Sequence, residues 1–141
     1  MREGRTSPAT AAGYGDSPWG GVMGAAPGES MRNHPHQPLE HALEIITLAR
    51  PLVEAVARRD RDLGAQLRRA LSSIALNLAE ATGNQAGNAR LRYESARGSL
   101  YEARAALQVA IAWGYVSVES AGAALESMNT LGGRVFGLAR R

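Results

Sequence analysis

A row of polar side chains runs through the middle of the sequence at helical spacing. It contains two amides, a guanidinium, a hydroxyl and a carboxylate, at Gln66, Arg69, Ser73, Asn77 and Glu80. Successive members are three or four residues apart, so a helix places them on one side. Such a set can form hydrogen bonds and ion pairs with a matching row or with a ligand. The pattern therefore predicts a groove or a contact between subunits rather than a catalytic site.

Arginines form the second chemically distinctive set. All 16 basic residues are arginine, and the chain has a net charge of +3. Guanidinium groups suit phosphate and carboxylate partners better than lysine ammonium groups do. The candidate nucleic-acid-binding residues are arginines of the central region and a tyrosine able to stack on a base, namely Arg68, Arg69, Arg90, Arg92, Arg97, Tyr101 and Arg104. The alternative is that these arginines pair with nearby glutamates or with neighbouring subunits.

Catalytic and metal-binding chemistry finds little support in the residue types present. A di-iron site in a helical bundle needs Glu-x-x-His pairs, and no histidine follows His41. The chain has no cysteine, no glycine-rich phosphate loop and no nucleophile elbow. His34 and His36 precede His41, but their segment offers no rigid frame to hold a metal geometry. We therefore expect no enzymatic activity, no metal site and no cofactor.

Four helices are expected to position these residues. Hydrophobic periodicity predicts them at about 39–59, 62–82, 89–113 and 118–138. The second helix has an apolar face formed by Leu63, Leu67, Ala70, Leu71, Ile74, Leu78 and Ala81. The third has one formed by Tyr93, Ala96, Leu100, Ala103, Leu107 and Ala110. Because the connections are short, the pattern favours an all-α, antiparallel up-down-up-down four-helix bundle over residues 39–141.

Polar residues and glycines mark the expected ends of these helices. Asp60 or Asp62 is placed to cap the second helix, and Ser117 is placed to cap the fourth. Gly83 is placed for a left-handed C-cap of the second helix, and Asn88 is the expected N-cap of the third.

The segment before the bundle differs in composition from the rest. Residues 1–38 hold most of the prolines and many glycines, so we expect a disordered tail. Met23 and Met31 are alternative starts to Met1. No apolar stretch has the length of a transmembrane helix, and no signal peptide is recognisable. These features predict a cytoplasmic protein without membrane contact.

An antiparallel hairpin of the second and third helices brings small residues together. With the turn centred near Ala86, Ser73 comes level with Gly98 and Ser99. Small side chains let two helix backbones approach closely. We therefore expect a close approach at Gly98 and a loss of stability when Gly98 is replaced by leucine.

The same register brings opposite charges level with each other. Arg69 comes level with Glu102, which predicts an ion pair. Glu80 comes level with Arg92, which predicts a contact of Glu80 with Arg92 or Arg97. Such pairs each contribute about 1 kcal/mol at most when they are exposed to solvent.

Four blocks of sequence resemble a known family. The blocks are Gln66-Leu-Arg-Arg-Ala, Ser73-Ile-Ala-Leu-Asn-Leu-Ala-Glu80, Ala96-Arg-Gly-Ser-Leu-Tyr-Glu102 and Gly114-Tyr-Val116. In order and spacing they are similar to the signature of the 23S rRNA-intervening-sequence protein family. The chain departs from that signature at Ala81, where the family usually has glycine. The family-motif positions of structural or interface character are Gln66, Arg69, Ser73, Asn77, Glu80, Gly98, Ser99 and Glu102.

The resemblance implies an antiparallel four-helix bundle that assembles into a homopentameric ring and has no enzymatic activity. Family members are encoded within intervening sequences of bacterial rRNA genes and elsewhere. The fold is also similar to that of the accessory variability determinant of diversity-generating retroelements, a basic pentamer that binds nucleic acid and a reverse transcriptase. Two hypotheses follow. The protein binds RNA or DNA, or it is an oligomeric scaffold that docks a ribosomal or polymerase partner.

Overall fold

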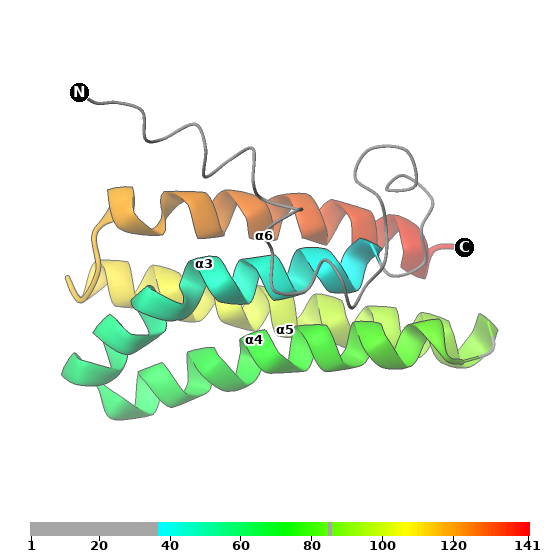
Figure 1. Ribbon diagram of the computed structural model, residues 1–141, viewed down its shortest axis with the longest axis horizontal. Coiled ribbons are helices and arrows are strands. Elements are labelled where there is room, and N and C mark those ends of the chain that lie inside the picture. The colour runs from blue at the N-terminus through cyan, green and yellow to red at the C-terminus, as the bar shows by residue number, and fades with distance from the viewer. Residues whose placement is uncertain (1–36, 85) are drawn as a thin grey trace, which may run out of the picture.

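A computed structural model describes residues 37–84 and 86–141, and these residues contain four helices and no strand (Figure 1). The helices are α3 (Gln37–Arg59), α4 (Arg61–Thr82), α5 (Ala86–Ala112) and α6 (Val118–Ala139). The predicted disordered tail lies outside the described residues, except that Gln37 and Pro38 already belong to α3. The expected all-α fold is confirmed.

Successive helices run in opposite directions. In Figure 1, α3 and α5 run from right to left, whereas α4 and α6 run from left to right. Each helix packs against two neighbours, since α4 contacts α3 and α5, and α6 contacts α5 and α3. The α3–α6 contact closes the ring of four helices, which gives the expected up-down-up-down bundle.

The core is built mainly from alanine and leucine, because the chain has few large aromatic residues. The predicted face of α4 is buried at every position except Leu63, which packs against the core from its edge. The predicted stripe of α5 is likewise buried apart from Tyr93, which is half-buried. Many buried alanines allow the helices to lie close together. The largest fully buried side chains are Ile45, Leu67, Ile74, Leu78, Leu107, Met128, Leu131, Val56 and Val135.

One end of the bundle is tied together by a capping carboxylate. Oδ1 of Asp60 accepts a hydrogen bond from the backbone N–H of Leu63 at 3.0 Å, so Asp60 is the N-cap of α4. Oδ2 of the same residue accepts a hydrogen bond from the Tyr115 hydroxyl at 3.3 Å. Gly114, with φ of 81°, turns the chain into this position after α5. The Gly-Tyr pair therefore links the α5–α6 connection to the α3–α4 turn.

The opposite end contradicts two expectations about the α4–α5 turn. Gly83 has φ of −98°, so it does not form a left-handed cap. Instead, the Asn84 side chain donates to the Glu80 carbonyl at 2.7 Å, which satisfies the end of α4 without positive φ. Asn88 is not an N-cap, because α5 already begins at Ala86. The fourth helix does begin as expected, with the Ser117 hydroxyl accepting from the Ser120 N–H at 3.0 Å.

The close approach of helices occurs at a different glycine from the one predicted. A Cβ at Gly98 would meet nothing within 4 Å, and Gly98 is exposed on the outer side of α5. A Cβ at Gly64 would lie 2.7 Å from both the Cα and the Cβ of Ala57. The tight contact is therefore between α3 and α4. The prediction failed because the register fixes how far along a helix a residue lies, but not which way it faces.

Candidate functional site

The polar row of α4 meets α5 through hydroxyl and amide contacts. The Ser99 hydroxyl donates to the Ser73 hydroxyl at 2.8 Å, as the predicted register required. Asn77 Nδ2 lies 3.1 Å from the same Ser73 oxygen and 2.9 Å from the Ser73 carbonyl oxygen. All three side chains are half-buried. The middle of the row is therefore a hydrogen-bonded seam between α4 and α5.

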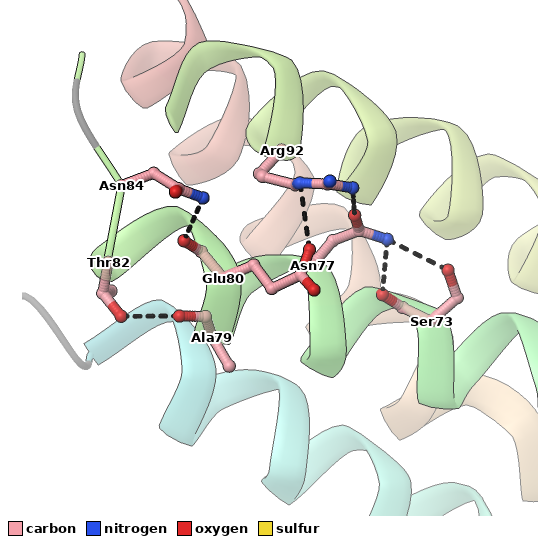
Figure 2. A network of polar contacts seen from close by, with 7 residues as sticks. All are labelled: Ser73, Asn77, Ala79, Glu80, Thr82, Asn84 and Arg92. Carbon is pink, nitrogen blue, oxygen red and sulfur yellow. Dashed lines mark hydrogen bonds and ion pairs between the residues drawn. The ribbon is translucent and has the colours of Figure 1, made fainter. Parts of the chain in front are cut away.

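Arg92 extends this seam towards the α4–α5 turn (Figure 2). Its Nε lies 2.9 Å from Glu80 Oε1, so the predicted contact between Glu80 and Arg92 is present. Its Nη1 lies 3.4 Å from Asn77 Oδ1, which is a long hydrogen bond. Arg92 thus bridges two members of the polar row, and its guanidinium is partly used within the chain.

The far end of the row differs from the prediction. Glu102 Oε2 lies 3.5 Å from Gln66 Nε2, and Glu102 makes no ion pair with Arg69. Arg69 lies with Arg68 along an open depression on the outer side of α4, whose other lining residues are Ser72, Ser73, Leu76, Asn77 and Glu80. Arg69 is level with Glu102 along the axis, but it lines this depression and Glu102 contacts Gln66 instead. The outer side of α4 is therefore an open polar surface that also carries the exposed Leu76.

A second cluster lies on the surface where α5 meets α6. The Arg97 guanidinium lies over the Phe136 ring at 4.8 Å from its centroid, and the Arg140 guanidinium lies at 5.0 Å from the same centroid. Arg97 Nη1 contacts Glu94 Oε1 at 2.8 Å, and Arg97 Nη2 donates to the Tyr101 hydroxyl at 3.1 Å. Cation–π attraction and hydrogen bonds hold this cluster together. Glu94, rather than Glu80, is the partner of Arg97.

The sequence reading missed Phe136 and Arg140 as members of this cluster. Their spacing of four residues on α6 places them on one side of the helix, which was a usable signal. Arg90 and Arg141 lie nearby, at the start of α5 and after the end of α6, and line a recess of about 320 Å³ with Tyr93. Four arginines therefore share this end of the α5–α6 surface.

The remaining candidates are not gathered into one site. Arg104 is half-buried on α5 and makes no ion pair with the described residues. Tyr101 exposes 57% of its surface, but its hydroxyl is held by Arg97. The candidate arginines thus divide between the outer side of α4, the α4–α5 seam and the α5–α6 surface.

His41 has a structural environment between α3 and α6. Its Nδ1 accepts a hydrogen bond from Arg134 Nη1 at 2.9 Å, and its Nε2 lies 2.9 Å from the Ser127 hydroxyl. Burial, and then the positive charge of Arg134, lower the pKa of His41 from 6.5 to about 4. The imidazole is therefore neutral near pH 7, with Nε2–H donating to Ser127. His34 and His36 lie outside the described residues.

The described part of the chain contains no cluster of three histidine, cysteine or acidic residues placed to hold a metal ion. Between residues 37 and 141, leaving out residue 85, no helix has the length and apolarity needed to cross a membrane. What the polar residues can do is hydrogen-bond, pair ions and contact anions.

Comparison with known proteins gives one match. No curated protein and no solved structure is significantly similar to the chain. A family profile described as 23S rRNA-intervening sequence protein matches residues 39–137, a range that contains nearly all of the four helices and all four sequence blocks. The chain belongs to the 23S rRNA-intervening sequence protein family.

Proposed function

We propose that the protein is a non-enzymatic, homo-oligomeric helical bundle that binds RNA or DNA without sequence preference through its arginines. The observation that carries the nucleic-acid part is the charge of the second half of the bundle. Residues 86–141 hold seven arginines and four glutamates, whereas residues 37–84 hold six arginines and six acidic residues. Phosphate groups are attracted to such a basic surface whatever the base sequence. The RNA-related description of the family supports the same conclusion.

The outer sides of α4 and α5 support the homo-oligomeric part of the proposal. Leu76 on α4 and Leu91 on α5 expose 66% and 65% of their surfaces. Gly98, a family-motif position on α5, has open space beside it. Exposed apolar side chains beside a polar row are typical of a surface that another subunit covers. A pentamer is the assembly that the family resemblance implies.

Mass photometry and light scattering test the assembly. The wild-type chain is expected to form a ring of several copies, and Leu91→Glu is expected to shift it towards the monomer. Leu48→Glu is the matched control, because Leu48 is exposed on α3, away from α5. A wild-type protein that stays monomeric at micromolar concentration would contradict the proposal.

Nucleic-acid binding is tested by mobility shift with labelled RNA and DNA of mixed sequence. Because the expected contacts are to phosphates, affinity is expected to fall steeply between about 50 and 200 mM salt and to depend little on sequence. Absence of any shift at about 50 mM salt would rule out the nucleic-acid part of the proposal.

The alternative is an oligomeric scaffold that docks a ribosomal protein or a reverse transcriptase without touching nucleic acid. The ion pairs of Arg92 with Glu80 and of Arg97 with Glu94 favour it, because they occupy arginines within the chain. The two functions give different results in the same assays. A stable oligomer that retards neither RNA nor DNA would be the scaffold.

A further inference from the structure

We propose that the α5–α6 guanidinium cluster, in which Arg97 and Arg140 both contact the Phe136 ring, is the surface that binds the phosphodiester backbone. The inference rests on the proposed nucleic-acid binding and names the part of the molecule that performs it. The residues that carry it are Arg97, Arg140 and Phe136, with Arg90 and Arg141 extending the same surface.

The ring of Phe136 holds two positive charges close together. Each guanidinium carbon lies about 5 Å from the ring centroid, so the two cannot be more than about 10 Å apart. Two like charges at that distance repel each other unless something fixes them. The attraction of each guanidinium to the electron-rich ring offsets this repulsion. The pair is therefore positioned before any ligand arrives.

Arg140 offers its donors to a ligand, and Arg97, whose side chain exposes 23% of its surface, offers fewer. A guanidinium has five N–H donors, and Arg97 uses one Nη towards Glu94 and the other towards Tyr101. Arg140 is exposed and makes no ion pair with the described residues. Among the described residues, Glu94 is the one carboxylate bonded into the cluster, so this surface keeps a net positive charge. Paired N–H donors of this kind match the oxygens of a phosphate group.

The surface continues from the cluster towards the end of the bundle. Arg90 lies two turns before Arg97 on α5, and Arg141 directly follows Arg140. Both line the recess that also contains Tyr93. The arginines are therefore spread along α5 and the C-terminal end of α6 rather than gathered at one point. A strand with one phosphate per nucleotide has its charges spaced along a line in the same way.

The rings between the arginines favour nucleic acid over an acidic protein. Tyr101 is largely exposed beside Arg97, Phe136 contacts Arg97 and Arg140, and Tyr93 lines the recess with Arg90. Surfaces that bind single strands combine arginines with aromatic rings on which bases stack. Nothing in the cluster selects one base over another, so the expected ligand is RNA or DNA of any sequence.

The test measures binding of a fluorescent single-stranded RNA of about 20 nucleotides by anisotropy, from about 50 to 200 mM salt. The variants are Arg97→Ala, Arg140→Ala, their combination and Phe136→Leu. Arg58→Ala is the control with the same charge change, because Arg58 is exposed in the last turn of α3, away from α5 and α6 in the chain. Circular dichroism melting of each variant establishes that it is folded.

We expect each arginine removed from the cluster to reduce the slope of log affinity against log salt by about 0.7, and Arg58→Ala to leave it unchanged. Phe136→Leu keeps the charge and is expected to weaken binding several-fold, because the guanidiniums lose their support. If the wild type binds RNA and the cluster variants match it, only the location is wrong. If the wild type binds no RNA, the proposed function fails as well. The same variants are also tested with labelled polyglutamate. If the wild type binds polyglutamate but no RNA, and the cluster variants lose that binding, the surface binds an acidic protein instead.

Discussion

The two helical hairpins of the bundle carry similar numbers of arginines but differ in charge. The α3–α4 hairpin balances its arginines with an equal number of carboxylates, whereas α5–α6 has a clear excess of arginine. The net charge of the chain is therefore concentrated in the second hairpin. The number of arginines along a helix says little about ligand binding until the carboxylates beside them are counted as well.

The hairpins also differ in how closely their glycines pack, and this difference has the largest expected effect on stability. Gly64→Ala should destabilise the protein by about 1–3 kcal/mol, because the new methyl group meets the backbone of Ala57 in α3. Gly98→Ala should be neutral or gain up to about 1 kcal/mol, because alanine favours a helix and Gly98 has open space beside it. Urea unfolding followed by circular dichroism measures both.

One result would contradict the expected difference between the two glycine variants. Equal losses at Gly64 and Gly98 would mean that α5 is also packed closely by another chain. In that case the loss of stability in Gly98→Ala should depend on protein concentration. Measurements at several dilutions therefore distinguish packing by another chain from packing within the chain.

The seam that joins the hairpins supplies the next largest effect. Ser73→Leu places a large side chain where the Ser99 hydroxyl lies 2.8 Å from that of Ser73, and it should cost about 1–2 kcal/mol. Ser72→Leu is the matched control, since Ser72 is exposed on the outer side of α4. Chemical denaturation of the two variants compares them directly. A loss at Ser72 as large as that at Ser73 would contradict the position of the seam.

Much of this seam could be predicted from sequence. The length of the α4–α5 turn fixes which residues are level, and this correctly paired Ser73 with Ser99 and Glu80 with Arg92. The apolar repeat likewise identified the buried face of α4, because a helix repeats every 3.6 residues whatever its neighbours are. Sequence patterns were enough to predict the features that depend on a single helix or a single turn.

The failed predictions depended on the direction in which side chains face. Gly98 was placed correctly along the axis, but it faces open space, and Gln66 rather than Arg69 reaches Glu102. The contact of Arg97 with Phe136 joins α5 to α6, so no spacing within α5 could reveal it. Which way a side chain faces is set by packing between helices, and the periodicity of a single helix leaves that open.

The second seam between the hairpins, where α3 meets α6, should respond to pH. His41 has a pKa of about 4 in the folded protein and about 6.5 when unfolded. The unfolded chain therefore binds the proton first, and stability is lost as pH falls from about 6.5 towards about 4. Glu44 acts in the opposite direction, because burial and the nearby Glu40 raise its pKa, which favours the folded state at low pH.

The contribution of His41 is measured by urea unfolding at pH 7.5 and pH 5. The wild type should lose stability between these values, and His41→Gln should lose less, because glutamine does not titrate. Arg134 pairs with the neutral imidazole, so the effect should come from the ring rather than from the arginine. The same pH-dependent loss in both proteins would assign it to another group.

The contrast in charge between the hairpins is tested most directly by two double variants with the same charge change. Arg68→Ala with Arg69→Ala alters the outer side of α4, and Arg90→Ala with Arg141→Ala alters the α5–α6 surface. The measurement is the salt dependence of RNA affinity for both. We expect the first pair to keep the wild-type slope and the second to reduce it by about 0.7 per arginine. A reduced slope for the α4 pair, with no change for the α5–α6 pair, would contradict the account.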